Sequence, residues 1–149
     1  MNPPAYDELI NALAELEDDA FLEGLSKELG ETVEHLIKRG FETATAPDGT
    51  PWAPRKLAAG RHRPPHLPLD YSGAMKSSFH VESNRTGLKV TNEAVSARGY
   101  PYAEVQNYGN RAGTLAARPM VPGDDLGTWE EPLRETALAF FNSKLNGVG

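Results

Sequence analysis

The chain has 149 residues, no cysteine, 39% hydrophobic residues and a formal net charge of −6. Its length fits one domain, the lack of cysteine excludes disulfides and thiolate zinc sites, and its acidity disfavours general nucleic-acid binding, which needs Lys and Arg against phosphate. No apolar run approaches the roughly 18 residues that span a bilayer, and no basic-then-apolar signal opens the chain, so we expect a soluble protein made in the cytoplasm.

Residues 1–45 carry a helical pattern. Apolar residues recur every three or four positions over residues 6–16 and again, after an acidic run, over residues 18–43. The second stripe keeps its phase through three interior glycines, so it predicts one long helix. Two explanations of these glycines stay open, namely the close approach of another helix or sheet, or a break at Gly30. The three are Gly24, Gly30 and Gly40.

Residues 46–70 are rich in proline, have no helical or alternating period, and are predicted to form an extended loop. Loops of this length in compact domains are functional or disordered. The loop is basic, whereas residues 7–34 carry almost only acidic charges, a polarity that suits head-to-tail contact between copies or a charged partner. Trp52, near its start, is expected to anchor the loop either in the domain or in a partner pocket. The basic residues are Arg55, Lys56, Arg61 and Arg63.

Residues 71–127 are predicted to hold a small antiparallel sheet and irregular segments. Two short alternating runs flank a turn that ends at Gly87, where a positive φ would be needed. Residues 98–101 read as a further turn before a short aromatic segment, 102–108. A β-hairpin followed by loops is therefore expected here.

Residues 128–145 are predicted to form the C-terminal helix, where Thr128 and Glu131 have the spacing of a capping box. Pro132 is tolerated in a first turn because no backbone donor is needed there. We therefore expect one α+β domain over residues 1–149, with a small antiparallel sheet packed by a long N-terminal helix and a C-terminal helix.

Metal and cofactor patterns are weak. His62 and His66 have the spacing of helical metal ligands, but Pro64 and Pro65 between them prevent a helix. Asp48 opens a segment that lacks the further oxygen ligands of a calcium loop, so a plain turn explains it better. We expect no metal and no cofactor.

Catalytic patterns are equally weak. Three serines, Ser72, Ser77 and Ser78, lack a convincing histidine–carboxylate pair, and His80 is better explained by strand packing. The basic loop beside Trp52 combines charge with a stacking surface, as in single-strand binders, but no second basic element follows. The sequence therefore predicts a protein that is not an enzyme, with nucleic-acid binding as the alternative from another class.

Four segments, in this order, resemble motifs of the phage virion morphogenesis family, the tail-completion proteins of Mu-like and related tailed phages. Residues 47–52, PDGTPW, are similar to a Pro-x-Gly-x-x-Trp turn, and residues 69–78 to a Leu, Thr-Gly-x-Leu and Ser pattern. Residues 102–109 are similar to Tyr-Ala-x-x-x-Gln-x-Gly, and residues 117–120, ARPM, to a Pro-Ala-Arg-Pro-Phe motif before a terminal helix.

The resemblance implies a structural virion protein that acts in tail completion or head–tail joining at the neck, assembled in the host cytoplasm. Its implied partners are other neck and tail proteins and further copies of itself in a ring, a hexamer by resemblance, through which DNA would pass. A tail terminator ring protein is the alternative within this class. The interface candidates are Trp52, Arg55, Lys56, Arg61, Arg63, Tyr102, Tyr108 and Arg118.

Overall fold

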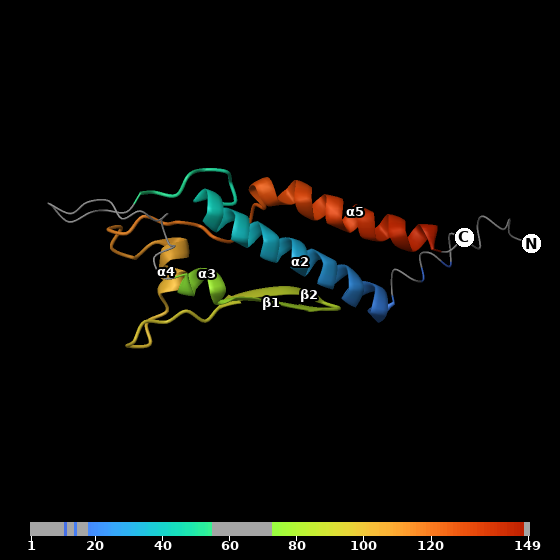
Figure 1. Cartoon of the computed structure of the whole chain (residues 1–149), viewed down its shortest axis with the longest axis horizontal. Helices are drawn as coiled ribbons and strands as arrows, with labels where there is room; N and C mark the ends of the chain where they lie inside the picture. Colours follow the sequence, from blue (N-terminus) through green and yellow to red (C-terminus); the bar gives the residue numbers. More distant parts are fainter. Residues whose placement is uncertain (1–10, 12–13, 15–17, 55–72, 148–149) are drawn as a thin grey trace, which may run out of the picture. The chain divides into compact units, whose positions relative to one another are not determined.

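A computed structural model describes residues 18–54 and 73–147, together with residues 11 and 14 (Figure 1). Most of the helix predicted over residues 6–16 and residues 55–70 of the predicted loop lie outside the described residues. The elements are helix α2 (Asp19–Thr43), the short helix α3 (Ala74–Ser77), strands β1 (Phe79–Asn84) and β2 (Gly87–Asn92), helix α4 (Tyr102–Tyr108), the 3-10 turn η1 (Gly127–Trp129) and helix α5 (Glu130–Asn146).

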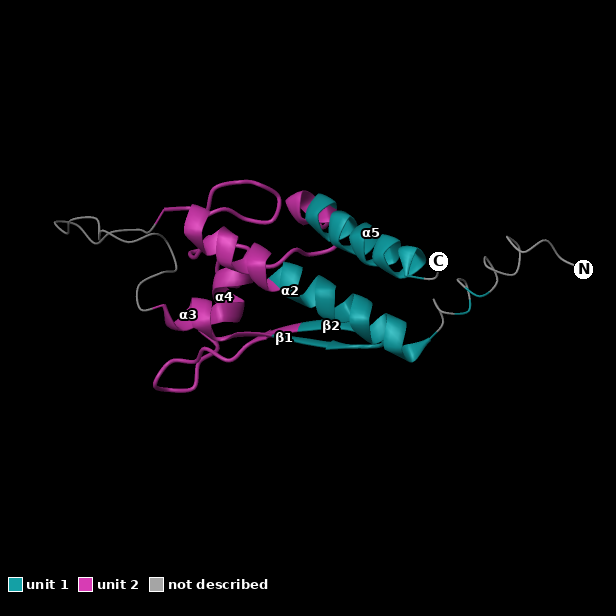
Figure 2. Cartoon of the chain, turned by 45° about the vertical axis from the view of Figure 1, so that its right-hand side comes forward, with its two compact units in different colours: residues 1–33, 81–89, 131–149 teal, residues 34–80, 90–130 magenta. Residues whose placement is uncertain are grey.

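The expected α+β class is confirmed, because the two-stranded antiparallel sheet comes with a long helix before it and a helix at the C-terminal end. No helix in the described part of the chain is both long and apolar enough to cross a membrane. The described residues divide into two compact units (Figure 2). Unit 1 comprises residues 1–33, 81–89 and 131–149, and unit 2 comprises residues 34–80 and 90–130.

Unit 1 is built on the contact between the first half of α2 and α5. The Phe21 ring lies 5.2 Å from the Phe140 ring, edge to face, and 5.3 Å from the Phe141 ring. A Cβ at Gly24 would lie 2.9 Å from the tip of the Phe140 ring, which is closer than real Cβ contacts come. Gly24 therefore permits the approach of the two helices, so the first explanation offered for the glycines holds at this position.

Gly30 lies where unit 1 packs α2 on the hairpin. It is buried, and a Cβ there would lie 3.4 Å from side-chain atoms of Val81 and Leu88. The helix runs through Gly30 without interruption, so a break at this residue is excluded.

The predicted hairpin is confirmed, with Arg85 and Thr86 between its strands. Asn84 Oδ1 accepts the backbone N–H and the hydroxyl of Thr86, and Gly87 has φ of 144°. That angle lies in the region that glycine adopts without the steric penalty of a side chain. The turn residues thus fit the two-residue connection between the strands.

Unit 2 packs around Phe41, near the end of α2. Its side chain is 1% exposed and meets the rings of Trp52, at 5.3 Å, and Phe79, at 6.0 Å, both edge to face. Burying one such aromatic ring stabilises a fold by about 1.5–3 kcal/mol. The other buried apolar side chains of unit 2 are Leu36, Ile37, Ala46, Met75, Ala94, Ala103, Met120 and Trp129.

Helix α4 was not predicted, because residues 102–108 were expected within the sheet and irregular region. Pro101 precedes it with φ of −78°, and its buried residues, Ala103 and Asn107, are four apart on one face. Seven residues are too few for a helical period to be recognised in the sequence.

The C-terminal helix is confirmed, but the capping box at its start is wrong. Thr128 lies in the 3-10 turn before α5, and both its backbone N–H and its hydroxyl donate to the carbonyl of Pro47, each at 2.7 Å. Thr128 therefore ties the start of α5 to the segment after α2 instead of capping the helix.

Candidate protein interface

The turn over residues 44–52 sets the direction of the chain where the basic loop was predicted to begin. Ala46 N–H donates to Thr50 O at 2.8 Å, and Trp52 N–H donates to Ala44 O at 2.7 Å. Asp48 Oδ1 accepts the backbone N–H of Thr50 at 2.8 Å and its hydroxyl at 2.6 Å. These bonds, the hydroxyl first, lower the pKa of the Asp48 carboxyl. The plain turn expected at Asp48 is confirmed.

Trp52 is anchored inside unit 2, the first of the two locations considered for it. Its side chain is 5% exposed, packs edge to face on Phe41, and donates its indole N–H to Pro119 O at 2.8 Å. A buried tryptophan usually needs such a partner for its one polar atom. Trp52 therefore joins the turn to the segment around residue 119.

Arg118 holds the two residues that follow Trp52. Its side chain is 6% exposed, and its guanidinium donates to Ala53 O at 2.8 Å, to Pro54 O at 3.1 Å and to Gln106 Oε1 at 3.0 Å. The Arg118 backbone N–H also donates to Gln106 O, at 2.7 Å. A buried guanidinium needs acceptors for its N–H groups, and these three carbonyl oxygens supply them. We call Arg118, Gln106 and Trp52 the clamp.

Asn107, the neighbour of Gln106 on α4, fixes the chain beyond the clamp. It is buried, and its Oδ1 accepts the backbone N–H groups of Met120 at 2.7 Å and Val121 at 3.3 Å. The sequence placed Gln106 and Asn107 within a segment, residues 102–109, expected to belong to a contact surface, and it did not predict these bonds inside the chain. The available signal was the position of these two residues and of Pro119 inside two of the four family-like segments.

The remaining interface candidates differ in their exposure. Tyr102 is partly buried at the start of α4, whereas Tyr108 at its end is 71% exposed. Four of them, Arg55, Lys56, Arg61 and Arg63, lie outside the described residues, as do His62 and His66. The contact of all the candidates with a partner stays a prediction.

The polar groups considered for catalysis have ordinary structural partners. His80 Nε2 lies 3.5 Å from a carboxylate oxygen of Glu93, and both side chains are exposed. The hydroxyls of Ser77 and Ser78 donate to the backbone carbonyl of Ala74. Ser72 lies outside the described residues. Neither described serine is held by His80.

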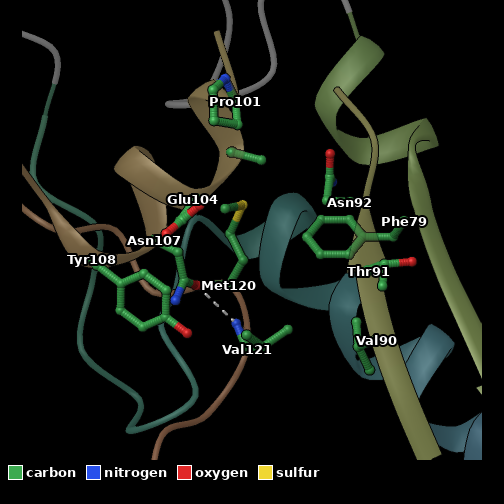
Figure 3. A pocket seen from close by; sticks show the side chains of 11 residues that line it. Phe79, Val90, Thr91, Asn92, Pro101, Glu104, Asn107, Tyr108, Met120 and Val121 are labelled. Carbon is green, nitrogen blue, oxygen red and sulfur yellow. Dashed lines mark hydrogen bonds between the residues drawn. The ribbon is translucent and has the colours of Figure 1, made fainter. Parts of the chain in front are cut away.

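A pocket of about 290 Å³ opens beside α4 in unit 2. Figure 3 shows side chains of α4 on one side of it, Phe79 and residues of β2 on the other, and Met120 and Val121 between them. Its residues are Phe79, Val90, Thr91, Asn92, Pro101, Ala103, Glu104, Asn107, Tyr108, Met120 and Val121. Helix α4 thus contributes to both features of unit 2: Gln106 belongs to the clamp on residues 53–54, and Ala103, Glu104, Asn107 and Tyr108 line the pocket.

The model of the phage virion morphogenesis family matches residues 5–131, which is most of the chain and includes the clamp. This match defines the class, a protein with a structural or assembly role in a phage virion. The chain belongs to the phage virion morphogenesis family. A search of curated proteins and a search of solved structures found no match.

Proposed function

We propose that the chain acts in tail completion or head–tail joining at the neck of a Mu-like or related tailed phage, through protein contacts and without a catalytic step. The family match over residues 5–131 supports a role in the virion. The observation that carries the finer proposal is the clamp, which links three family-like segments: Arg118 bonds the carbonyls of Ala53 and Pro54 and the side chain of Gln106, and Trp52 bonds Pro119 O.

The position of the clamp favours docking of the basic segment onto a partner protein, because Arg55 and Lys56 follow the clamped residues directly in the sequence. A binding segment loses less conformational entropy on docking when its origin is already fixed by the fold. The basic side chains and the exposed Tyr108 would then meet acidic and apolar surfaces of neck or tail proteins, or of further copies in a ring. A hexameric ring is the stoichiometry we propose from the family resemblance.

The test is removal of the gene from the phage genome, followed by electron microscopy of the lysate. We expect DNA-filled heads and separate tails of normal length, with infectious particles restored when the purified chain is added to the mixed lysate. Joined, infectious particles in the absence of the chain would refute the proposal.

The same micrographs test the tail terminator alternative, because loss of a terminator leaves tails of uncontrolled length. Abnormally long tails would move the role from joining to termination.

A salt-dependent gel shift with single- and double-stranded DNA tests the nucleic-acid alternative, since such binding weakens steeply with salt. We expect no shift from a chain with a net charge of −6.

A further inference from the structure

The pocket beside α4 is suited to an apolar side chain. Its 290 Å³ lies at the lower limit of small-molecule pockets, which begin at about 300 Å³. Asn92 and Asn107, two of its polar lining residues, already bond within the chain: Asn92 Nδ2 donates to Met75 O, and Asn107 Oδ1 accepts from Met120 and Val121. Six of the eleven lining residues are apolar: Phe79, Val90, Pro101, Ala103, Met120 and Val121. They offer an aliphatic side chain an apolar contact surface.

The rim of the pocket carries negative charge and an exposed aromatic ring. Among the described residues that line it, Glu104 is the one with a formal charge, and it is exposed. Tyr108, one turn further along α4, is the most exposed large hydrophobic residue of the described chain. The occupant should therefore place a cation next to its apolar group.

The C-terminal half of α5, in unit 1, has this combination. Leu138 and Leu145 are each 54% exposed and lie seven residues apart, so they share one face of the helix at a spacing of about 10 Å. Lys144 is the one charged residue of the sequence over 137–146. Its ammonium lies 5.4 Å from the centre of the Phe140 ring, exposed and able to reach an external carboxylate. The stripe of Leu138 and Leu145 is thus a convex apolar surface beside a single cation.

We propose that Leu145 of one copy enters the α4 pocket of a second copy, with Lys144 against Glu104 and Leu138 against Tyr108. The pocket and the stripe belong to different parts of the chain, so the contact joins unlike surfaces and leaves a free pocket and a free stripe at the two ends of any pair. Repeated contacts of this kind close into a ring or extend as a filament.

The inference rests on the proposed function for its use in the virion, but the contact itself is tested on the purified full-length chain. Because the natural chain has no cysteine, introduced thiols report on chosen positions alone. The variants Tyr108→Cys and Leu138→Cys, which keep Leu145, are prepared separately, mixed, and treated with a short bismaleimide linker. We expect a covalent dimer in the mixture and little in either variant alone, because the contact joins position 108 to position 138.

Affinity provides the second measurement, by sedimentation velocity over a range of concentrations. Leu145→Ser should weaken self-association by about tenfold or more, as loss of a central apolar anchor does. Its matched control is Leu126→Ser, which removes another exposed leucine and should leave association unchanged.

Charge reversal tests the pairing on the rim. Glu104→Lys and Lys144→Glu should each weaken association by about fivefold, and the two changes together should restore most of it. Glu82→Lys, an equal charge change at an exposed site on β1, is the control.

Equal cross-linking in the mixture and in the single variants, or none, would overturn the inference, as would unchanged association of Leu145→Ser. If the contact fails these tests but phage without the gene still shows unjoined heads and tails, the proposed function stands and the inference falls. If the contact passes but phage without the gene forms normal particles, the proposed function is refuted instead.

Discussion

Replacement of Arg118 by methionine should destabilise the chain by about 3 kcal/mol. The substitution keeps a long side chain but removes donors to Ala53 O, Pro54 O and Gln106 Oε1, at 2.8, 3.1 and 3.0 Å. Each hydrogen bond from a charged group contributes about 1.5–3 kcal/mol net, and the desolvation of a buried guanidinium offsets part of the sum. The remaining loss corresponds to a fall in melting temperature of about 6–12 °C for a chain of this size.

Urea denaturation followed by tryptophan fluorescence measures this loss, because Trp52 lies beside the clamped segment. Arg118→Lys should recover less than half of the lost stability, since one ammonium cannot replace a planar fork that reaches two segments. Arg98→Met is the control: Arg98 is exposed in a turn, and its loss should change stability by no more than about 0.5 kcal/mol. Equal denaturation midpoints for Arg118→Met and Arg98→Met would show that the buried bonds contribute nothing net, and the reasoning would fail.

Substitutions at three further positions test the turn that the clamp holds, each by its unfolding midpoint. Trp52→Phe should cost about 1 kcal/mol through the lost indole donor, and Trp52→Ala about 3–5 kcal/mol through the lost ring; a Trp52→Phe chain as stable as the natural one would contradict the hydrogen bond as a separate contribution. Gly127→Ala should cost about 2 kcal/mol or more, because φ is 56° and the new Cβ would lie 2.5 Å from Pro47 O; a neutral result would contradict this close approach. The lowered pKa of Asp48 stabilises the fold above the unfolded pKa of about 3.9, and this stabilisation is lost as pH falls through the folded pKa. In thermal scans at pH values from about 5 down to about 3, Asp48→Asn should therefore lose less stability than the natural chain, and parallel losses would refute the role of Thr50.

The long elements were predictable because each repeats its period several times. Helix α2 has 25 residues with one apolar stripe, and the hairpin has two alternating strands around a glycine that needs positive φ. Helix α4 has seven residues, fewer than the window over which a helical period can be distinguished from chance. The number of periods that an element repeats separated success from failure: a six-residue strand repeats its period three times, whereas the seven residues of α4 repeat theirs about twice.

The clamp could not be predicted from residue types alone. Arg118 was assigned to a contact surface from the family-like segment that contains it, and its burial was not expected because charged side chains are rarely buried. Two of its partners are backbone carbonyls, of Ala53 and Pro54, and because every residue has a carbonyl they leave no pattern in the sequence. The order of the family-like segments indicated that these residues matter together. Their convergence in space required the structure.

Stability and assembly should depend on different residues of this chain. The clamp residues Trp52 and Arg118 are buried and direct their polar atoms to their own chain, whereas Tyr108 and Leu145 are exposed. A change in the clamp should lower the unfolding midpoint and head–tail joining together, because the basic segment that begins at Arg55 would lose its fixed origin. A change at Tyr108 or Leu145 should lower joining with the midpoint unchanged, since exposed side chains contribute little to folding. Joining measured by plaque restoration and plotted against the urea midpoint would then give two separate groups. A single line through both groups would mean that the exposed residues act through stability, and that neither is a contact with a partner.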